Sequence, residues 1–332
     1  MEVSILIPTY NRGYVLGQAL ESALRQTYQD FEILVINDGS TDNTLEVLKS
    51  FPSKKIRLIE HPQNRGCSAA YNTGILAAAA PLVAMLDSDD LWKPNYLERQ
   101  VDFLARHPEA DAVFSDLEIV GETKQLPSLT SLMRAFPNLL QQKPPGEEFV
   151  FDQMEMYLCL LEELPIKPSA CVIRRTILDK TGIFNETWPS GTDWDLLLRI
   201  SRISRFGYIN LPLAIQKWSP DATHRKYWEK DKLFLIGIFD KEKQNSKRSQ
   251  ECVNAINRGL LKHYSDLALF YLTTGRRAKS IATYFTGFEK THSVGMLLRA
   301  GAALAPLSLR EHSKRWFRKT AAPKYGLKAG TR

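Results

Sequence analysis

The chain has 332 residues and a net charge of +7, with 44% hydrophobic and 24% charged residues, as in globular proteins of one large domain with an appendage or of two domains. Its four cysteines are scattered without paired spacing, which argues against a disulfide framework or a zinc site and favours a cytoplasmic protein with reduced thiols. We expect neither a signal peptide nor a membrane span, because the chain starts without a charged n-region and contains no run of about 18 uncharged apolar residues.

The first third of the chain alternates short apolar runs with segments of helical periodicity. The expected strands cover residues 3–7, 31–36, 56–59, 82–86 and 112–115. The expected helices between them cover about 15–24, 41–48 and 68–79, the second capped by Ser40 or Thr41. This alternation predicts an α/β fold with right-handed crossovers and a mostly parallel sheet flanked by helices.

The most informative stretch is the end of the fourth strand, where Leu86 precedes Asp87-Ser88-Asp89-Asp90. Ligands of open α/β sheets collect at the carboxyl ends of the strands, and crowded carboxylates there repel one another unless a cation or donors neutralise them. In an extended segment, residues two apart face the same way, so we expect Asp87 and Asp89 to converge on one site. Mg²⁺ or Mn²⁺ would suit it, whereas an isolated Asp-x-Asp is more often a solvated turn.

The loop after the first strand lacks the glycine pattern of a dinucleotide site. Pro8-Thr9-Tyr10-Asn11-Arg12-Gly13 contains one glycine, so a diphosphate would have to be neutralised elsewhere, and the Asp87-Ser88-Asp89 cation site offers a way. Asp38 ends the second strand. Its carboxylate could accept hydrogen bonds from a ribose or a base, or it could bond the backbone of its own turn.

Four motifs in this order resemble the family 2 glycosyltransferases of the GT-A fold. They are Pro8-Thr9-Tyr10-Asn11-Arg12, Asn37-Asp38-Gly39-Ser40-Thr41-Asp42, Asn64-Arg65-Gly66 with Asn72-Thr73-Gly74, and Leu86-Asp87-Ser88-Asp89-Asp90. The resemblance implies a nucleotide-sugar site formed by Pro8, Thr9, Tyr10, Arg12, Asp38, Arg65, Asp87 and Ser88. In that site Thr9, Tyr10 and Arg12 would flank the base, Asp38 would bond to it, Asp87 would lie near the ribose, and Arg65 would lie near the base or the phosphates. It also implies that Asp89 holds a divalent metal ion, Mn²⁺ or Mg²⁺, against the diphosphate.

Residues 121–165 carry the least pattern, with several prolines and a predicted helix over 151–164. A strand is expected over 168–173. The apolar face of the next helix follows Ser190 or Thr192 as cap, which puts Asp193 and Asp195 in its first turn, where the helix dipole favours acids.

The segment Thr192-Asp193-Trp194-Asp195-Leu196 resembles the Glu-Asp-x-Asp-Leu segment of the same family, with Thr192 in place of the glutamate. The resemblance implies that Asp193 is the general base. The family commonly places a histidine near the metal after the next strand, here 211–217. Trp218 stands at that position, and His224, six residues later, is more simply a surface residue.

Charge divides the chain unevenly, with a net charge of −8 over residues 1–216 and +15 over residues 217–332. From about Tyr227 the pattern is that of amphipathic helices. The last apolar face, 296–309, is followed by a basic segment containing Trp316 and Phe317. This segment could contact an anionic membrane as a peripheral protein does, or it could be a packed helix with a basic tail. No nucleic-acid partner is expected.

We therefore expect a GT-A domain over 1–226, with a nucleotide-sugar half at 1–118 and an acceptor half at 119–226, followed by a helical basic region over 227–332. The predicted reaction is an inverting transfer from a nucleotide-diphosphate sugar, preferably a UDP-sugar, to a hydroxyl of a glycan or lipid-linked acceptor in cell-surface polysaccharide synthesis. The alternatives are a non-catalytic nucleotide-sugar-binding protein and a metal-dependent nucleotidyltransferase. A glycoside hydrolase would need a second carboxyl group as acid.

Overall fold

The computed structural model describes residues 1–121, 125–188, 191–217, 227–244 and 249–304. The chain forms two compact units, Met1–Tyr227 and Trp228–Arg332. Ser190, Trp218, His224 and the basic segment after residue 304, all named above, lie outside the described residues.

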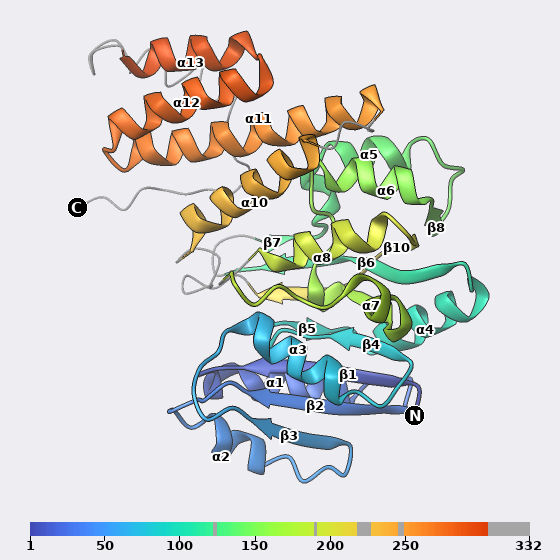
Figure 1. Ribbon diagram of the computed structural model, residues 1–332. Helices are drawn as coiled ribbons and strands as arrows, with labels where there is room; N and C mark the ends of the chain where they lie inside the picture. Colours follow the sequence, from blue (N-terminus) through green and yellow to red (C-terminus); the bar gives the residue numbers. More distant parts are fainter. Residues whose placement is uncertain (122–124, 189–190, 218–226, 245–248, 305–332) are drawn as a thin grey trace. The chain divides into compact units, whose positions relative to one another are not determined.

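The first unit is built on one mixed sheet (Figure 1). Its strands are β1 (Val3–Thr9), β2 (Phe31–Asn37), β3 (Ile56–Glu60), β4 (Leu82–Met85), β5 (Leu91–Trp92), β6 (Ala110–Val120), β7 (Gln125–Leu126), β8 (Glu148–Phe151), β9 (Cys171–Arg174) and β10 (Arg205–Lys217). The order is β3-β2-β1-β4-β9-β6-β10-β5, with β7 on β6 and β8 on β10. β3, β2, β1 and β4 are parallel, as are β6 and β10, and β9 runs antiparallel between β4 and β6.

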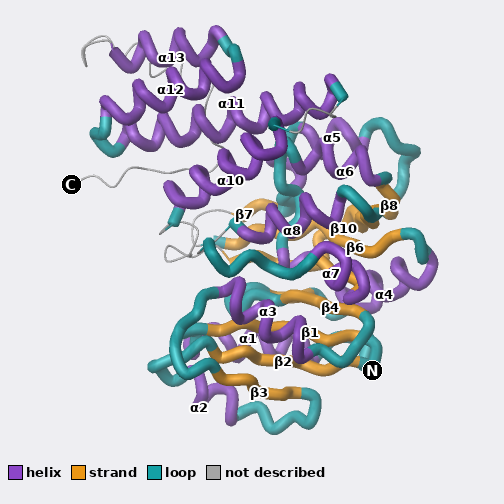
Figure 2. The backbone as a smooth tube through the Cα atoms, viewed as in Figure 1, coloured by secondary structure: helices purple, strands orange, loops and turns teal. Residues whose placement is uncertain are grey.

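Helices flank this sheet (Figure 2). They are α1 (Gly13–Leu24), α2 (Thr44–Lys49), α3 (Cys67–Ala77), α4 (Tyr96–Arg106), α5 (Ala135–Leu140), α6 (Gln153–Leu160), α7 (Arg175–Thr181) and α8 (Thr192–Ser201), with 3₁₀ turns at Thr130–Leu132 and Pro168–Ala170. The architecture confirms the predicted mostly parallel α/β sheet with flanking helices and a helical C-terminal region.

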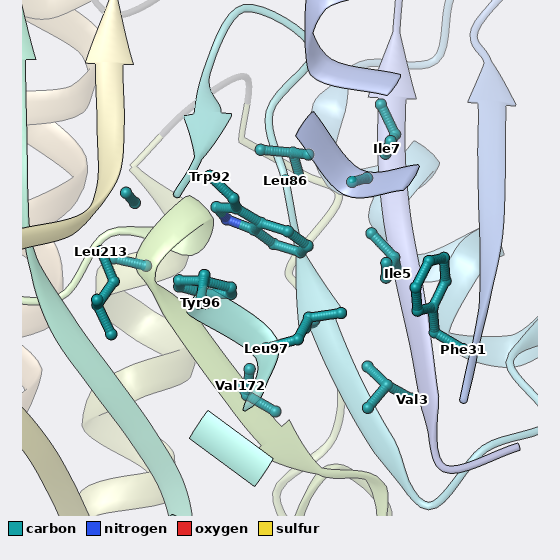
Figure 3. Close-up of a cluster of buried hydrophobic side chains, with 14 of the residues drawn as sticks. Val3, Ile5, Ile7, Phe31, Leu86, Trp92, Tyr96, Leu97, Val172 and Leu213 are labelled. Carbon is teal, nitrogen blue, oxygen red and sulfur yellow. The ribbon is translucent and has the colours of Figure 1, made fainter. Parts of the chain in front are cut away.

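Strand alternation divides the core between the two faces of the sheet. Odd-numbered residues of β1 and β2, such as Val3 and Phe31, join one buried cluster with side chains of α1 and α4, where Trp92 stacks on Tyr96 at 4.3 Å between ring centroids (Figure 3). On the other face α3 packs on β1 and β2. A Cβ at Gly74 of α3 would lie 2.9 Å from Ile36, so glycine permits this close approach.

Several predicted elements differ from the observed ones. α2 begins after Asn43, because Ser40 accepts a hydrogen bond from the backbone of Asn11 instead of capping the helix. The helix expected over 151–164 is shorter and follows a strand, because Asp152 and Glu155 form a capping box that starts α6 at Gln153. The strand expected over 168–173 opens as a 3₁₀ turn, and the one expected over 112–115 extends to Val120 along β10.

The second unit is a set of helices, α10 (Trp228–Lys243), α11 (Gln250–Thr273), α12 (Arg277–Thr291) and α13 (Val294–Leu304). Glu229 of α10 bonds both the hydroxyl of Tyr271 and the guanidinium of Arg276, each at 2.7 Å. Over the described residues, none of the helices has the length and apolar character that crossing a bilayer would require.

Candidate functional site

The loops after β1 and β2 are bound to each other at the carboxyl edge of the sheet. Asn11, in the left-handed region at φ 51°, accepts a hydrogen bond from the backbone of Thr41 at 2.8 Å, and its own N–H donates to Ser40 at 3.0 Å. The N–H of Gly13 donates to Asp42 at 3.1 Å, and a Cβ at Gly13 would lie 2.1 Å from the Asn43 side chain. These contacts fix the loop that carries the predicted base-binding residues.

The predicted binding residues of that loop differ in their exposure to solvent. Pro8 and Thr9 are buried within β1, and Tyr10 is 45% exposed. Within the described parts of the chain, the buried hydroxyl of Thr9 has no hydrogen-bond partner. The guanidinium of Arg12 turns toward the end of β4 and lies 3.7 Å from the carboxylate of Asp89. Arg12 therefore joins the first loop to the acidic cluster.

Asp38, at the end of β2, has both carboxylate oxygens engaged. One oxygen bonds the ring of His61 at 2.7 Å and the N–H of Arg65 at 2.9 Å, and the other accepts from the N–H of Gly66 at 2.8 Å. The second ring nitrogen of His61 bonds Thr73 of α3 at 2.9 Å. Asp38 thereby shapes the loop before α3, and the same loop carries Arg65, whose guanidinium pairs with Glu186 at 3.2 Å.

The acidic residues after β4 form a turn. The N–H of Asp90 donates to the carbonyl of Asp87 at 3.0 Å, so the expectation of an extended segment was wrong. Asp87 accepts from the hydroxyl of Tyr71 at 2.7 Å, and the buried Asp90 accepts from the N–H of Lys217 at 3.2 Å. Ser88 is buried between them. Asp87 and Asp89 remain partly exposed at the turn.

The charges of this turn act on one another. Burial, and then the negative charge of Asp89, raises the pKa of Asp87 to about 6, while the bond from Tyr71 and the charge of Lys167 oppose the shift. Burial and the charges of Asp87 and Asp89 raise the pKa of Asp90 well above its usual range. A cation at this turn would relieve the repulsion between these carboxylates.

The donor set fits Mg²⁺ or Mn²⁺, which take hard carboxylate oxygens and complete their coordination with phosphate oxygens. The described residues include no cluster of three or more His, Cys, Asp or Glu side chains arranged around one point. An ion held at this turn by Asp89 could also bind oxygens of a bound diphosphate. Sequence reasoning named Asp89 as the ligand, and the ion pair of its carboxylate with Arg12 is a contact that the sequence did not reveal.

Helix α3 ties the acidic turn to the second half of the unit, a role that sequence reasoning missed. Its Tyr71 stacks on Phe184 at 5.3 Å between ring centroids, besides bonding Asp87. Asn72 accepts from the N–H of Phe184 and donates to its carbonyl, both at 2.9 Å. Ser68 bonds the hydroxyl of Thr192 at 2.7 Å. The only sequence signal was the place of Asn72 within a recognised motif.

The two acids in the first turn of α8 have different surroundings. Asp195 pairs with Arg199 at 2.9 Å, and Arg199 also holds the carbonyls of Thr181 and Ile183. No side chain or backbone group of the described ranges donates a hydrogen bond to Asp193, which lines a small apolar cavity with Met85 and Phe184. Asp193 therefore lies beside the end of β4.

The start of α8 also corrects the predicted cap. Gly191 precedes the helix in the left-handed conformation at φ 76°, and Thr192 is the first helical residue. Cys67 is exposed at the start of α3, and desolvation followed by the charges of Asp87 and Asp193 raises the pKa of its thiol. The start of α3 thus lies near both Asp87 and Asp193.

Two relatives illustrate the sequence comparisons. An uncharacterized glycosyltransferase of Rickettsia felis is 32% identical over 205 residues, which cover 61% of this chain and 32% of that protein. The matched region is thus well under two thirds of that relative's length. The Escherichia coli protein WfgD, named UDP-Glc:alpha-D-GlcNAc-diphosphoundecaprenol beta-1,3-glucosyltransferase, is 27% identical over 216 residues, covering 65% of this chain and 76% of WfgD.

Solved structures share the fold. Residues 1–349 of S. aureus TarS in complex with UDP-GlcNAc match with a TM-score of 0.64 and 16% identity, covering 88% of this chain and 82% of that one. The mannosyltransferase PcManGT of Pyrobaculum calidifontis in complex with GDP-Man and Mn²⁺ matches with a TM-score of 0.58 and 20% identity, covering 95% and 82%. The family model described as Glycosyl transferase family 2 matches residues 4–182, more than half of the chain, and the chain therefore belongs to this family.

Proposed function

We propose that the chain transfers a sugar from a UDP-sugar to a hydroxyl of a glycan or lipid-linked acceptor, with inversion at the anomeric carbon, in cell-surface polysaccharide synthesis. One observation supports this most directly. Two sets of carboxylates, Asp87 with Asp89 after β4 and Asp193 on α8, come from opposite halves of the unit, and α3 bonds to both regions.

In this proposal Asp193 removes the proton of the acceptor hydroxyl. The oxygen then attacks the anomeric carbon from the face opposite the nucleotide, and the bond from that carbon to the diphosphate oxygen breaks, with its electron pair leaving on the diphosphate. A divalent ion held by Asp89 would supply positive charge to the leaving diphosphate. Asp193 suits the role of base because the described residues give its carboxylate no competing hydrogen-bond donor.

The choice of donor and acceptor rests on the relatives. The name of WfgD specifies UDP-Glc and an acceptor linked to diphosphoundecaprenol, and TarS was solved with UDP-GlcNAc. PcManGT was solved with GDP-Man and Mn²⁺, which supports a metal-dependent reaction. A lipid-linked acceptor would require the protein to work at the cytoplasmic face of a membrane, as a peripheral protein.

The test is a thermal-shift panel of UDP-Glc, UDP-GlcNAc and GDP-Man, each with and without Mn²⁺, because a ligand that binds the folded state raises its stability. We expect a UDP-sugar to raise Tm, and to do so more strongly with Mn²⁺. The anomeric configuration of the product is then read by NMR, and an α-linked donor should give a β-linked product. Retention of configuration, or pyrophosphate release from a nucleoside triphosphate, would contradict the proposal.

A further inference from the structure

Helix α13 of the second unit is apolar on both of its faces. On one face Met296, Ala300 and Ala303 are buried against the neighbouring helices. A Cβ at Gly287 of α12 would lie 2.3 Å from the Met296 side chain, so the fit between the two helices is close. Burial of this face accounts for the docking of α13.

Polar contacts hold α13 in that orientation. Arg299 donates to the hydroxyl of Ser265 on α11 at 2.7 Å. Arg277 of α12 donates to the carbonyl of Ala303 at 2.9 Å and also bonds the carbonyl of Leu304 at the end of the helix. These bonds favour the orientation in which Met296, Ala300 and Ala303 face the neighbouring helices.

The outward face of α13 carries no charge and no polar side chain. Val294 is 65% exposed, Leu298 is 64% exposed and Leu304 is 56% exposed, with the exposed Gly295 and Gly301 among them. At 100° per residue Val294, Leu298 and Gly301 lie opposite Met296, Ala300 and Ala303, whereas Leu304 lies about 40° from Ala300, at the edge of the exposed face. These outward positions form an apolar stripe, and an exposed apolar stripe is suited to contact with another apolar phase.

The charge of the chain indicates which kind of apolar phase contacts this stripe. Residues 217–332 carry a net charge of +15, and eight Lys or Arg residues against one acid follow Leu304 directly. Arg310 is six residues beyond Leu304, a reach of at most about 20 Å in an extended chain. A surface that touches the stripe is thus within reach of these cations. Nucleic acid would attract the cations but presents mainly its charged backbone to a docked helix, whereas an anionic bilayer interface accepts both the cations and an apolar helix face.

We propose that the outward stripe of α13, formed by Val294 and Leu298 with Leu304 at its edge, inserts into the interface of an anionic membrane. The proposal specifies the surface behind the peripheral localisation proposed above. It does not depend on the donor, the metal or Asp193, because the contact forms in the second unit.

The experiment is flotation of the full-length protein with phosphatidylcholine vesicles containing one quarter phosphatidylglycerol, and with pure phosphatidylcholine vesicles, at low and high salt. No donor or acceptor is added, so the outcome is independent of catalysis. We expect binding to the anionic vesicles and only partial loss at high salt, because the apolar contact is not screened. Leu298→Glu should weaken binding at least about tenfold. Leu76→Glu is the matched control, because Leu76 on α3 is 77% exposed in the first unit, and it should bind as the wild type does.

Circular dichroism melts confirm that both variants are folded. Wild-type binding to neither vesicle, or equal flotation of Leu298→Glu and wild type, would overturn the proposal. So would a dimer, seen by light scattering without vesicles, that Leu298→Glu converts to a monomer, since a second copy of the chain would then cover the stripe.

Discussion

The ends of β2 and β4 carry the same residue type in different environments. Asp38 after β2 bonds His61 and the N–H groups of Arg65 and Gly66, so its negative charge is matched by donors of the protein. The turn after β4 gathers Asp87, Asp89 and Asp90, whose mutual repulsion and burial raise the pKa of two of them. A carboxylate matched by internal donors holds a loop in place, whereas one that faces other carboxylates is suited to an external cation.

The same contrast recurs on α8, within a single turn. Asp195 is paired with Arg199, whose guanidinium also holds the end of α7 and the following loop. Asp193, two residues earlier, has no donor among the residues that the structure describes, and it lies beside Met85. Asp195 thus supports the start of α8 through Arg199, and Asp193 stays the proposed base.

The largest expected effect separates the two acids of α8. Asp193→Asn should lower kcat by about a thousandfold, the contribution of a general base, while UDP-sugar binding measured by calorimetry stays unchanged. Asp195→Asn is the matched control. It should keep kcat within a few-fold while lowering Tm, because Arg199 loses its charged partner. Equal losses of kcat in both variants would show that the contrast does not identify the base.

The next effect concerns Asp89. Asp89→Asn should weaken Mn²⁺-dependent binding of UDP by at least about tenfold. Substitution of residues that only hydrogen-bond a metal ligand already weakens metal binding by that factor, and Asp89 is the proposed ligand itself. Titration calorimetry of UDP with and without Mn²⁺ measures it. The variant also releases Arg12 from its ion pair, so metal-free UDP binding should stay the same or improve. Unchanged Mn²⁺ dependence would exclude Asp89 as the ligand.

Asp38→Asn tests the acid at the end of β2, for comparison with Asp89 after β4. Its neutral amide cannot match three donors as well as the carboxylate does, and we expect the free energy of unfolding to fall by about 1–3 kcal/mol. The Mn²⁺ dependence of UDP binding should persist, in contrast to Asp89→Asn. The variant could instead lose UDP affinity while its free energy of unfolding in urea stays that of the wild type. Asp38 would then contact the base, as the family resemblance implies.

The smallest effect extends the comparison from acids to a buried base, His263 of α11. Burial, and then the charges of Lys232 and Lys262, holds the pKa of His263 well below its usual range, so the ring is neutral in the folded protein. The unfolded chain takes up a proton below about pH 6.5, and stability should therefore fall with decreasing pH by at most about 1.4 kcal/mol per pH unit.

His263→Gln should remove that part of the slope when urea unfolding is measured from pH 5 to pH 8. Above about pH 7.5 the free energy of unfolding should depend on pH in the same way in the wild type and the variant. At those pH values His263 is neutral in both the folded and the unfolded wild type. A wild-type slope that the substitution leaves unchanged would assign the pH dependence to other groups.

The sequence by itself determined the elements of the first sheet and the order of its motifs. Apolar runs such as Val3–Ile7 and Leu82–Leu86 are buried on both faces, so their composition predicts strands whatever their neighbours. Loop motifs at the ends of such strands must lie at one sheet edge, which is why Asp38 and Asp87 could be assigned to it. The family resemblance has the same origin, because its motifs lie in these loops.

Only the tertiary structure decided which carboxylates are engaged and which face the site. The partners of Asp38 are 23 to 28 residues away, and the Asn72 bonds to Phe184 span 112 residues. No local pattern specifies contacts at such separations, because they depend on how the strands pair and how α3 packs across them. The antiparallel direction of β9 between β4 and β6 could not be predicted for the same reason, since strand direction is set by sheet pairing and leaves no mark in a four-residue strand.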